Sequence, residues 1–363
     1  MDFALIGHPA DYVHFAALAG RDAPDGEARF NRYRETLSRF VDWTPSYVSR
    51  QRPRLPLPSG RVLEGCLIIC PFLPERLDSP QALKRAHEKV IQAAQLAGEL
   101  GVKAVGLGGF TSILEGLHGN PLAQREGMAV TSGNALTAAL AVAQTSEMLD
   151  RLGRRVEDEI LAVVGATGDI GLICCRQLGV RARKLILIAR NKGRLALLRE
   201  TLGDLERIEI ATDLAAVGRA GVVILAAGAT QTVASEDMLA PGAVACDVGF
   251  PKNLSYSVHP RADVLVFSGG LAELPAEVDL QVYTGLPTAR LMYGCFTEAM
   301  VLAARADRSN LSTAQGGLTP ERVRLVLDAA TCLGVAPASP YRGAERIGEA
   351  ELQRFRCVAR AYS

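Results

Sequence analysis

Short apolar runs alternate along the chain with stretches whose apolar residues recur at helical spacing. Near the start the runs are FALI (3–6), CLIIC (66–70) and VKAVGL (102–107), and amphipathic stretches cover about 80–99 and 133–152. Short apolar runs are typical of buried strands, and their alternation with amphipathic helices indicates βα units. This part of the chain is therefore predicted to be an α/β domain.

A charged break, RLGRRVEDE at 151–159, precedes a more regular section that continues to about residue 270. Its strand-like runs are apolar along their whole length, which is typical of a parallel sheet covered by helices on both faces. The pattern predicts a Rossmann-type, doubly wound domain. The predicted strands are EILAVVG, KLILIAR, RIEIA, GVVILAA, GAVACDVG and DVLVFSGG, and helices are predicted at 170–179 and 193–202.

The helix-like runs at about 288–305 and 319–333 come after this domain, and an arginine-rich tail ends the chain. The Pro- and Arg-rich stretch at 45–62 is predicted to be an exposed loop. Four parts are expected: an N-terminal α/β substrate domain (1–152), a nucleotide-binding Rossmann domain (153–287), a C-terminal helical segment that packs back on the N-terminal domain (288–338) and a tail (339–363).

The composition is that of an ordinary globular protein. The chain has 363 residues, of which 48% are hydrophobic and 22% charged, and its formal net charge is +1. Because no strong global field would attract nucleic acid or an anionic membrane, we expect no nucleic-acid partner, and any electrostatic docking must be local. No apolar run is long enough to span a bilayer, and the first residues lack the features of a secretory signal.

Eight cysteines are scattered through the sequence without a framework that suggests disulfides. No second Cys or His pair lies near Cys66 and Cys70 to complete a zinc site. The cysteine pattern and the missing signal together predict a cytoplasmic protein.

A glycine-rich turn stands between the first strand and the first helix of the predicted Rossmann domain. Glycines without Cβ atoms let the backbone approach a pyrophosphate at the start of a helix, where free N–H groups favour anions. The strand before, the helix after and a second strand ending about 20 residues on all favour a dinucleotide site over an ordinary turn. The residues of this turn are Gly165, Ala166, Thr167, Gly168, Asp169, Ile170 and Gly171.

The second strand ends in basic residues, where an NAD enzyme would place a carboxylate for the ribose hydroxyls. Arg190, Asn191 and Arg194 stand there instead. Since guanidinium groups bind a 2′-phosphate, NADPH is the predicted cofactor, with a solvated basic turn as the other interpretation. Later loops at the same sheet edge supply further candidates for cofactor contacts, namely Ala227, Gly228, Asp247 and Gly249, and Lys252 as a site residue.

Several blocks of sequence are spread over most of the chain, namely LIGHPADYVHF, CPFLPERL, VGLGGFTSIL, TSGNALTAA, VGATGDIG, LILIARNKGRL, DVGFPKNL and LMYGCFTEAMVL. In sequence and in order, these blocks resemble the long-chain acyl-[acyl carrier protein] reductases of the cyanobacterial alkane pathway. The match weakens in the Pro/Arg stretch and after about residue 338.

The resemblance implies reduction of a fatty acyl thioester to a fatty aldehyde with NADPH, by way of a cysteine-bound acyl group. The matching cysteine is Cys295, in YGCFTEA. A thiolate can take the acyl group from a carrier thioester and hold its carbonyl for hydride transfer, which calls for a cysteine of lowered pKa. The implied partners are an acyl carrier protein or acyl-CoA as donor and an aldehyde-consuming enzyme. A divalent metal such as Mg²⁺ is a family expectation that no ligand cluster in the sequence supports.

Further site residues belong to the matching blocks. His8 is a candidate for the site or a hydrogen-bonded structural histidine. The GLGGFTSIL turn is expected beside the substrate carbonyl, with backbone N–H groups near an oxyanion, rather than at a second nucleotide. Ser132 and Asn134 either contact substrate or cap the next helix. The candidates within the glycine turn are Gly108, Gly109, Phe110 and Thr111.

A long acyl chain would need an apolar tunnel, expected in the N-terminal domain and lined in part by the apolar faces of the helices at 80–99 and 133–148. An acidic carrier protein would need a basic patch for docking. A cluster of arginines can also be an ordinary solvated face of the protein. The two candidate patches are Arg50, Arg52, Arg54 and Arg61, and Arg151, Arg154 and Arg155.

Two other functions fit part of the pattern. A shikimate- or quinate-type dehydrogenase also has a catalytic domain before a Rossmann domain, and it would need no cysteine. A nucleotide-binding regulator without turnover would bind NADP and consume none. The GCFTEA block argues against both, through the resemblance alone.

Overall fold

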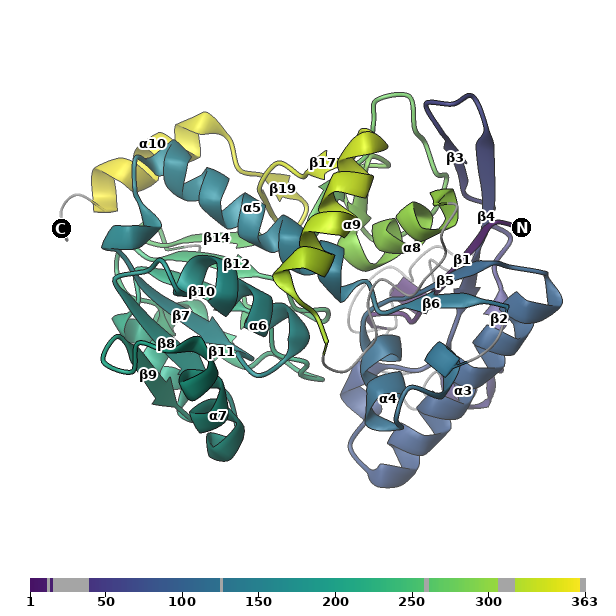
Figure 1. Ribbon diagram of the computed structural model, residues 1–363, viewed down its shortest axis with the longest axis horizontal. Coiled ribbons are helices and arrows are strands. Elements are labelled where there is room, and N and C mark those ends of the chain that lie inside the picture. The colour runs from purple at the N-terminus through teal and green to yellow at the C-terminus, as the bar shows by residue number, and fades with distance from the viewer. Residues whose placement is uncertain (12–13, 16–38, 125–126, 258–260, 306–316, 360–363) are drawn as a thin grey trace. The chain divides into compact units, whose positions relative to one another are not determined.

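The computed structural model describes residues 1–11, 14–15, 39–124, 127–257, 261–305 and 317–359. The chain forms two compact units, each built on its own sheet (Figure 1). The first unit contains residues 1–133, 274–314 and 332–334, and the second contains residues 134–273, 315–331 and 335–363. The predicted α/β fold class is confirmed.

The first unit is built on a mainly parallel sheet. Its strand order is β2-β4-β1-β5-β6, and β3 pairs with β4 beside this path. The central strand β1 is buried along its whole length, and its Ile6 lies opposite Ile68 of β4 and Leu107 of β5. The strands are β1 (Phe3–Gly7), β2 (Tyr47–Val48), β3 (Arg54–Pro56), β4 (Val62–Ile69), β5 (Ala104–Leu107) and β6 (Ala129–Thr131).

The stretch 45–62 is not simply an exposed loop, so that prediction is wrong. It forms β2 and β3, which pair antiparallel with β4. Leu55 is buried between the exposed residues Arg54 and Pro56. A strand at the edge of a sheet can alternate in this way and tolerates proline, since proline's missing N–H need not face a neighbouring strand.

Helices cover both faces of this sheet. Helix α3 (Pro80–Glu99) is capped by the Ser79 hydroxyl, which accepts from the Ala82 N–H at 3.2 Å. Its alanine-rich face packs with α4 (Phe110–Leu117) on the strand residues Ile68 and Val105. Because side chains alternate along a strand, Gly106 points the other way, toward α8 (Gly294–Ala304).

The second unit has six parallel strands in the order β14-β12-β10-β7-β8-β9. Counted along the chain this is the 3-2-1-4-5-6 order of the Rossmann fold, with the crevice for a ligand at the carboxyl ends of the strands. The strands are β7 (Ile160–Val164), β8 (Lys184–Ile188), β9 (Ile208–Ala211), β10 (Val222–Leu225), β12 (Val244–Asp247) and β14 (Leu265–Ser268).

One face of this sheet is covered by α5, α6, α7 and α10, and the other by short 3-10 helices and loops. The tail belongs to this core, because Leu352 and Phe355 of α10 are buried with Met148 and Leu149 of α5. The helices are α5 (Asn134–Leu152), α6 (Asp169–Cys174), which continues as one π-helical turn (Cys175–Gly179), α7 (Lys192–Leu202), α9 (Pro320–Cys332) and α10 (Glu349–Ala359).

The remaining strands of the described residues are short and form small sheets of two or three strands. They are β11 (Ala234–Ser235), β13 (Leu254–Ser255), β15 (Leu271–Glu273), β16 (Leu291–Tyr293), β17 (Ala336–Pro337), β18 (Tyr341–Arg342) and β19 (Glu345–Arg346). Within the described ranges, no helix has both the length and the apolar character that crossing a membrane would require.

Candidate active site

In the first unit, three turns lie at one edge of the sheet. Strands β1, β5 and β6 run parallel and side by side, so the residues that follow them share that edge. These residues are His8, the pair Gly108–Gly109, and Ser132–Gly133. The structure thus brings together candidates that lie over 120 positions apart in the sequence.

Helix α8 packs closely against this edge of the sheet because the residues that face it are glycines. A Cβ added to Gly106 would lie 2.6 Å from the Cβ of Ala299, and one added to Gly108 would lie 2.5 Å from the ring of Phe296. A Cβ on Gly133 would lie 2.0 Å from the Cα of Cys295. Real Cβ contacts are not this short, so glycine at these positions lets α8 approach.

Cys295 is the second residue of α8 and is partly exposed. By contrast, Cys66, Cys70, Cys174, Cys175 and Cys246 are buried, whereas Cys332 and Cys357 are exposed. Burial raises the pKa of the Cys295 thiol to about 11, although the backbone N–H groups of Gly109 and Phe296 near the sulfur oppose this rise. The expectation of a lowered pKa is therefore wrong, because desolvation and the nearby charge of Glu298 outweigh the N–H groups.

His8 is a buried, neutral histidine that joins β1 to the glycine turn. Its Nε2 accepts from the Phe110 N–H at 2.9 Å, and its Nδ1 lies 2.9 Å from the Pro9 carbonyl, which fits an Nδ1–H donor. Burial lowers its pKa to about 4. With both nitrogens engaged, His8 positions the turn beside Cys295.

The N–H groups of the glycine turn are largely committed to the protein itself. The Gly108 N–H donates to the Ile6 carbonyl at 2.8 Å, and the hydroxyls of Thr111 and Ser112 donate back to the carbonyls of Gly108 and Gly109 at 2.9 and 3.0 Å. Gly109 has a positive φ of 58°. Its N–H and that of Phe296 lie near the Cys295 sulfur, so both are candidates to stabilise an oxyanion at that cysteine.

A buried carboxylate lies one turn after the cysteine. Glu298 and Thr131 are both fully buried, and the Thr131 hydroxyl donates to Glu298. The Thr131 oxygen also accepts from the Gly133 N–H at 3.1 Å. Glu298 therefore fixes the β6 turn against the helix that carries Cys295. The adjoining candidate Ser132 is buried too.

In the second unit, the predicted dinucleotide turn has the expected local geometry. The Gly165 and Ala166 N–H groups donate to the Ile188 carbonyl, at 2.8 and 3.2 Å. A Cβ on Gly171 would lie 2.3 Å from the Gly165 oxygen, so this glycine serves close packing of helix and strand. Gly168 is exposed, and a Cβ there would meet only one atom, at 3.4 Å. No neighbouring atom among the described residues requires glycine at that position, whereas an approaching pyrophosphate would.

Neighbouring polar groups tie this turn in place. The Asn134 amide donates to the Asp169 carboxylate at 3.2 Å, so a predicted substrate residue and a predicted cofactor residue are hydrogen-bonded to each other. After β8, Asn191 caps α7 by accepting from the Arg194 N–H at 3.0 Å. The Arg194 side chain donates to the Thr167 carbonyl at 3.0 Å, and Arg190 is exposed.

The loop after β12 is organised around Asp247. This fully buried carboxylate accepts from the N–H groups of Gly249, Asn253 and Leu254 at 3.0–3.2 Å, and Lys252 donates to its backbone carbonyl. Asp247 therefore shapes the loop. Asn253 in turn holds Ala227 by two hydrogen bonds, at 2.7 and 2.9 Å, and leaves Gly228 exposed.

No model of a known protein family matches the chain. The chain is 33% identical over 291 residues to the long-chain acyl-[acyl-carrier-protein] reductase of Synechococcus elongatus, covering 77% of this chain and 84% of that protein.

The chain belongs to the long-chain acyl-[acyl-carrier-protein] reductase family.

This relative confirms the predicted resemblance, and membership in a reductase family makes the chain an oxidoreductase. It is also 26% identical over 325 residues to the aminotransferase PigE of a Serratia species, covering 86% of this chain and 37% of PigE. Solved structures that resemble it include a transhydrogenase from Sinorhizobium meliloti (17% identity, TM-score 0.30, 37% of this chain and 46% of that one). Another is the nucleotide-binding domain of glutamyl-tRNA reductase from Thermoplasma volcanium (16%, 0.26, 35% and 84%). These scores are too low to support a functional argument.

Acidic neighbours pair with all three arginines of the second predicted patch of this reductase and with two of the four in the first. Arg54 pairs with Glu64 and Arg61 with Asp2. The pairs of the second patch are Arg151–Glu349, Arg154–Glu159 and Arg155–Glu157. Arg154 also donates to the carbonyls of Gly221 and Gly242. These pairs weaken the case for either patch as a docking site for an acidic carrier.

The apolar faces expected to line an acyl tunnel pack in the cores of the reductase. The face of α3 lies against the first sheet and that of α5 against the second. Among the described residues, no three His, Cys, Asp or Glu side chains are grouped to hold a metal ion.

Proposed function

We propose that this reductase converts a long-chain fatty acyl thioester into the fatty aldehyde with NADPH, and that Cys295 carries the acyl group between the two half-reactions. An acyl carrier protein is the preferred donor and acyl-CoA a second one. Family membership supports the reaction. The observation that carries the role of Cys295 is its partly exposed position where glycine turns of the first unit meet the start of α8.

The first half-reaction exchanges one thioester for another. The Cys295 sulfur attacks the carbonyl carbon, the bond from that carbon to the donor sulfur breaks, and the thiol proton passes to the departing thiolate. The Gly109 N–H stabilises the negative oxygen of the tetrahedral adduct. Because one S–H bond replaces another, the exchange needs no net proton, and no separate base is assigned.

The second half-reaction needs a hydride, which NADPH supplies when bound. The turn from Gly165 to Gly171 would hold the pyrophosphate, and Arg190 with Asn191 would hold the 2′-phosphate. The exposed, sterically free Gly168 supports this assignment. On addition of hydride to the acyl carbon, the Cys295 thiolate leaves, and the aldehyde is released for an aldehyde-consuming enzyme.

Turnover with a long-chain acyl thioester and NADPH tests the proposal, with the aldehyde measured directly. Cys295→Ala should lose roughly a thousandfold or more of the rate, since it removes the nucleophile. Cys332→Ala, at an exposed cysteine, is the matched control and should keep the wild-type rate. Aldehyde formation by Cys295→Ala at the wild-type rate would contradict the assignment. NADH serving as well as NADPH would contradict the role of Arg190.

A further inference from the structure

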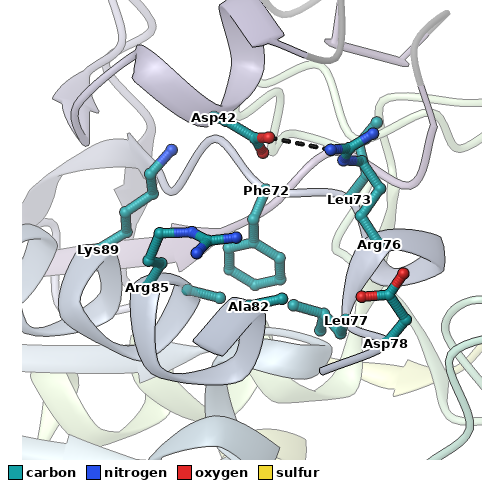
Figure 2. Close-up of a pocket in the computed structure, with 10 residues that line it drawn as sticks. Asp42, Phe72, Leu73, Arg76, Leu77, Asp78, Ala82, Arg85 and Lys89 are labelled. Carbon is teal, nitrogen blue, oxygen red and sulfur yellow. Dashed lines mark hydrogen bonds and ion pairs between the residues drawn. The ribbon is translucent and has the colours of Figure 1, made fainter. Parts of the chain in front are cut away.

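A cavity of about 140 Å³ opens between the start of α3 and the segment that follows β4 (Figure 2). Its apolar lining includes Phe72, Leu77 and Ala82. The charged side chains around it are Asp42, Arg76, Asp78, Arg85 and Lys89.

Among the described residues, Lys89 and Arg85 of this cavity have no acidic partner, and backbone carbonyls hold only Lys89. Asp42 and Arg76 pair at 3.0 Å, and the Lys89 ammonium donates to the carbonyls of Val41 and Pro71 at 2.8 and 2.6 Å. Within the described part of the chain, Arg85 has no ion-pair partner, and Figure 2 shows it reaching over the cavity beside Lys89. Three cations against two carboxylates leave the cavity with a net charge of +1. A guanidinium group above an apolar lining suits a ligand with an anionic head and an uncharged organic arm.

The cavity lies at the same sheet edge as Cys295. The Phe72 ring stacks on that of His8, with centroids 4.7 Å apart, and His8 holds the turn whose Gly109 N–H lies near the thiol of Cys295. Only β1 separates β4 from β5. Since neighbouring strands are about 4.8 Å apart, the segment after β4 and the turn after β5 are roughly 10 Å apart along the edge.

We propose that this cavity binds the phosphate of the phosphopantetheine arm on which acyl thioesters are carried, with Arg85 as its main contact. This inference rests on the proposed function and adds to it a binding site for the arm of the acyl donor. With about a dozen covalent bonds between phosphorus and sulfur, the arm spans roughly 15 Å when extended. The extended arm is therefore longer than the roughly 10 Å between the segment after β4 and the turn after β5. Acyl carrier protein and coenzyme A share this arm, so the site serves both.

Binding of the arm alone tests the site without turnover. 4′-Phosphopantetheine and pantetheine, which differ by the phosphate, are titrated by NMR into wild type, Arg85→Gln and Lys84→Gln. Wild type should bind the phosphorylated probe about tenfold more tightly, because a charge-assisted hydrogen bond is lost with the phosphate. Arg85→Gln should remove that difference, whereas Lys84→Gln, an exposed neighbour outside the cavity, should keep it. Equal binding of the two probes by wild type, no binding of either, or an unchanged difference in Arg85→Gln would overturn the inference.

Turnover separates the two possible sources of the phosphate. Arg85→Gln should raise KM about tenfold with both acyl-CoA and the acyl carrier thioester and leave kcat unchanged. A rise with the carrier thioester alone would show a contact with the carrier's surface and overturn the inference. If wild type reduces neither thioester while the two probes still differ and Arg85→Gln abolishes the difference, the proposed reaction fails and the anion site stands.

Discussion

The two units each place glycines at the carboxyl edge of a parallel sheet, but they use them differently. In the first unit, helix α8 occupies the space where a Cβ of Gly106, Gly108 or Gly133 would lie, and its atoms would be only 2.0–2.6 Å from that Cβ. In the second unit, Gly171 packs against backbone, whereas Gly168 is exposed and nearly free of contacts. Where the protein's own atoms occupy the space beside a glycine, the glycine serves packing. Where that space stays open, the glycine suits the approach of a ligand. The first edge is thus packed around a cysteine, and the second has the open glycine that the proposed nucleotide site requires.

Among the substitutions that test this contrast, Gly133→Ala should have the largest effect on the free energy of unfolding. Its φ is +69°, and its Cβ would collide with Cys295. Gly101, with a φ of +67° and nothing within 4 Å, is the matched control. Gly101→Ala should cost about 1–2 kcal/mol from backbone strain alone, and Gly133→Ala about 3 kcal/mol more from overpacking. Urea unfolding measures both, and equal losses would show that α8 does not depend on this glycine.

His8 tests whether the first edge is a fixed scaffold. His8→Leu should lower the free energy of unfolding by about 1–3 kcal/mol, because the Phe110 N–H loses its acceptor. Burial lowers the pKa of His8 to about 4, so as the pH falls below about 6.5 the unfolded chain takes up this proton first. Wild type should therefore lose stability between pH 6.5 and 4 more steeply than His8→Leu. Parallel stability curves for the two proteins would contradict the neutral, buried His8.

Gly168→Ala tests the open glycine of the second edge. Its φ of −86° suits alanine, so stability should change by less than about 1 kcal/mol. NADPH affinity should fall roughly tenfold, because the new methyl group occupies the approach of the pyrophosphate. Fluorescence titration gives the affinity and thermal unfolding the stability. An unchanged Kd for NADPH would remove the distinction between the two edges.

The smallest effect concerns the charge beside the thiol. Since the pKa of Cys295 is raised to about 11, its alkylation by iodoacetamide should quicken about tenfold per pH unit from pH 7 to 10, as the thiolate fraction grows. Glu298→Gln should lower that pKa, because the Glu298 charge raises it, and should speed alkylation at a given pH. Peptide mass spectrometry distinguishes Cys295 from the exposed Cys332 and Cys357. A rate that levels off below pH 9 would contradict the raised pKa.

Much of the fold could be predicted from local pattern. The helix predicted at 80–99 is α3, and the apolar runs of the second unit are the strands of its sheet. The glycine turn before α6 could be located because strand, turn and helix follow one another in the sequence. Strand β3 was missed because an edge strand rich in arginine and proline has the composition of a loop.

The site depends on contacts that no local pattern contains. Gly106 and Ala299 touch across nearly 200 positions, and Thr131 reaches Glu298 across 167. Glu298 stands three residues after Cys295, yet only the folded chain shows that it is buried. Two carboxylates that pair with candidate arginines are likewise distant in sequence, namely Asp2 with Arg61 and Glu349 with Arg151. Desolvation of the thiol follows from the same packing, which is why a lowered pKa was the wrong expectation.

An intact mass spectrum of the protein after incubation with a long-chain acyl thioester, without nucleotide, tests the central claim most directly. Wild type should gain the mass of one acyl group, Cys295→Ala should gain none, and addition of NADPH should discharge the adduct as aldehyde. An adduct of equal yield on Cys295→Ala, or none on wild type, would contradict Cys295 as the acyl carrier.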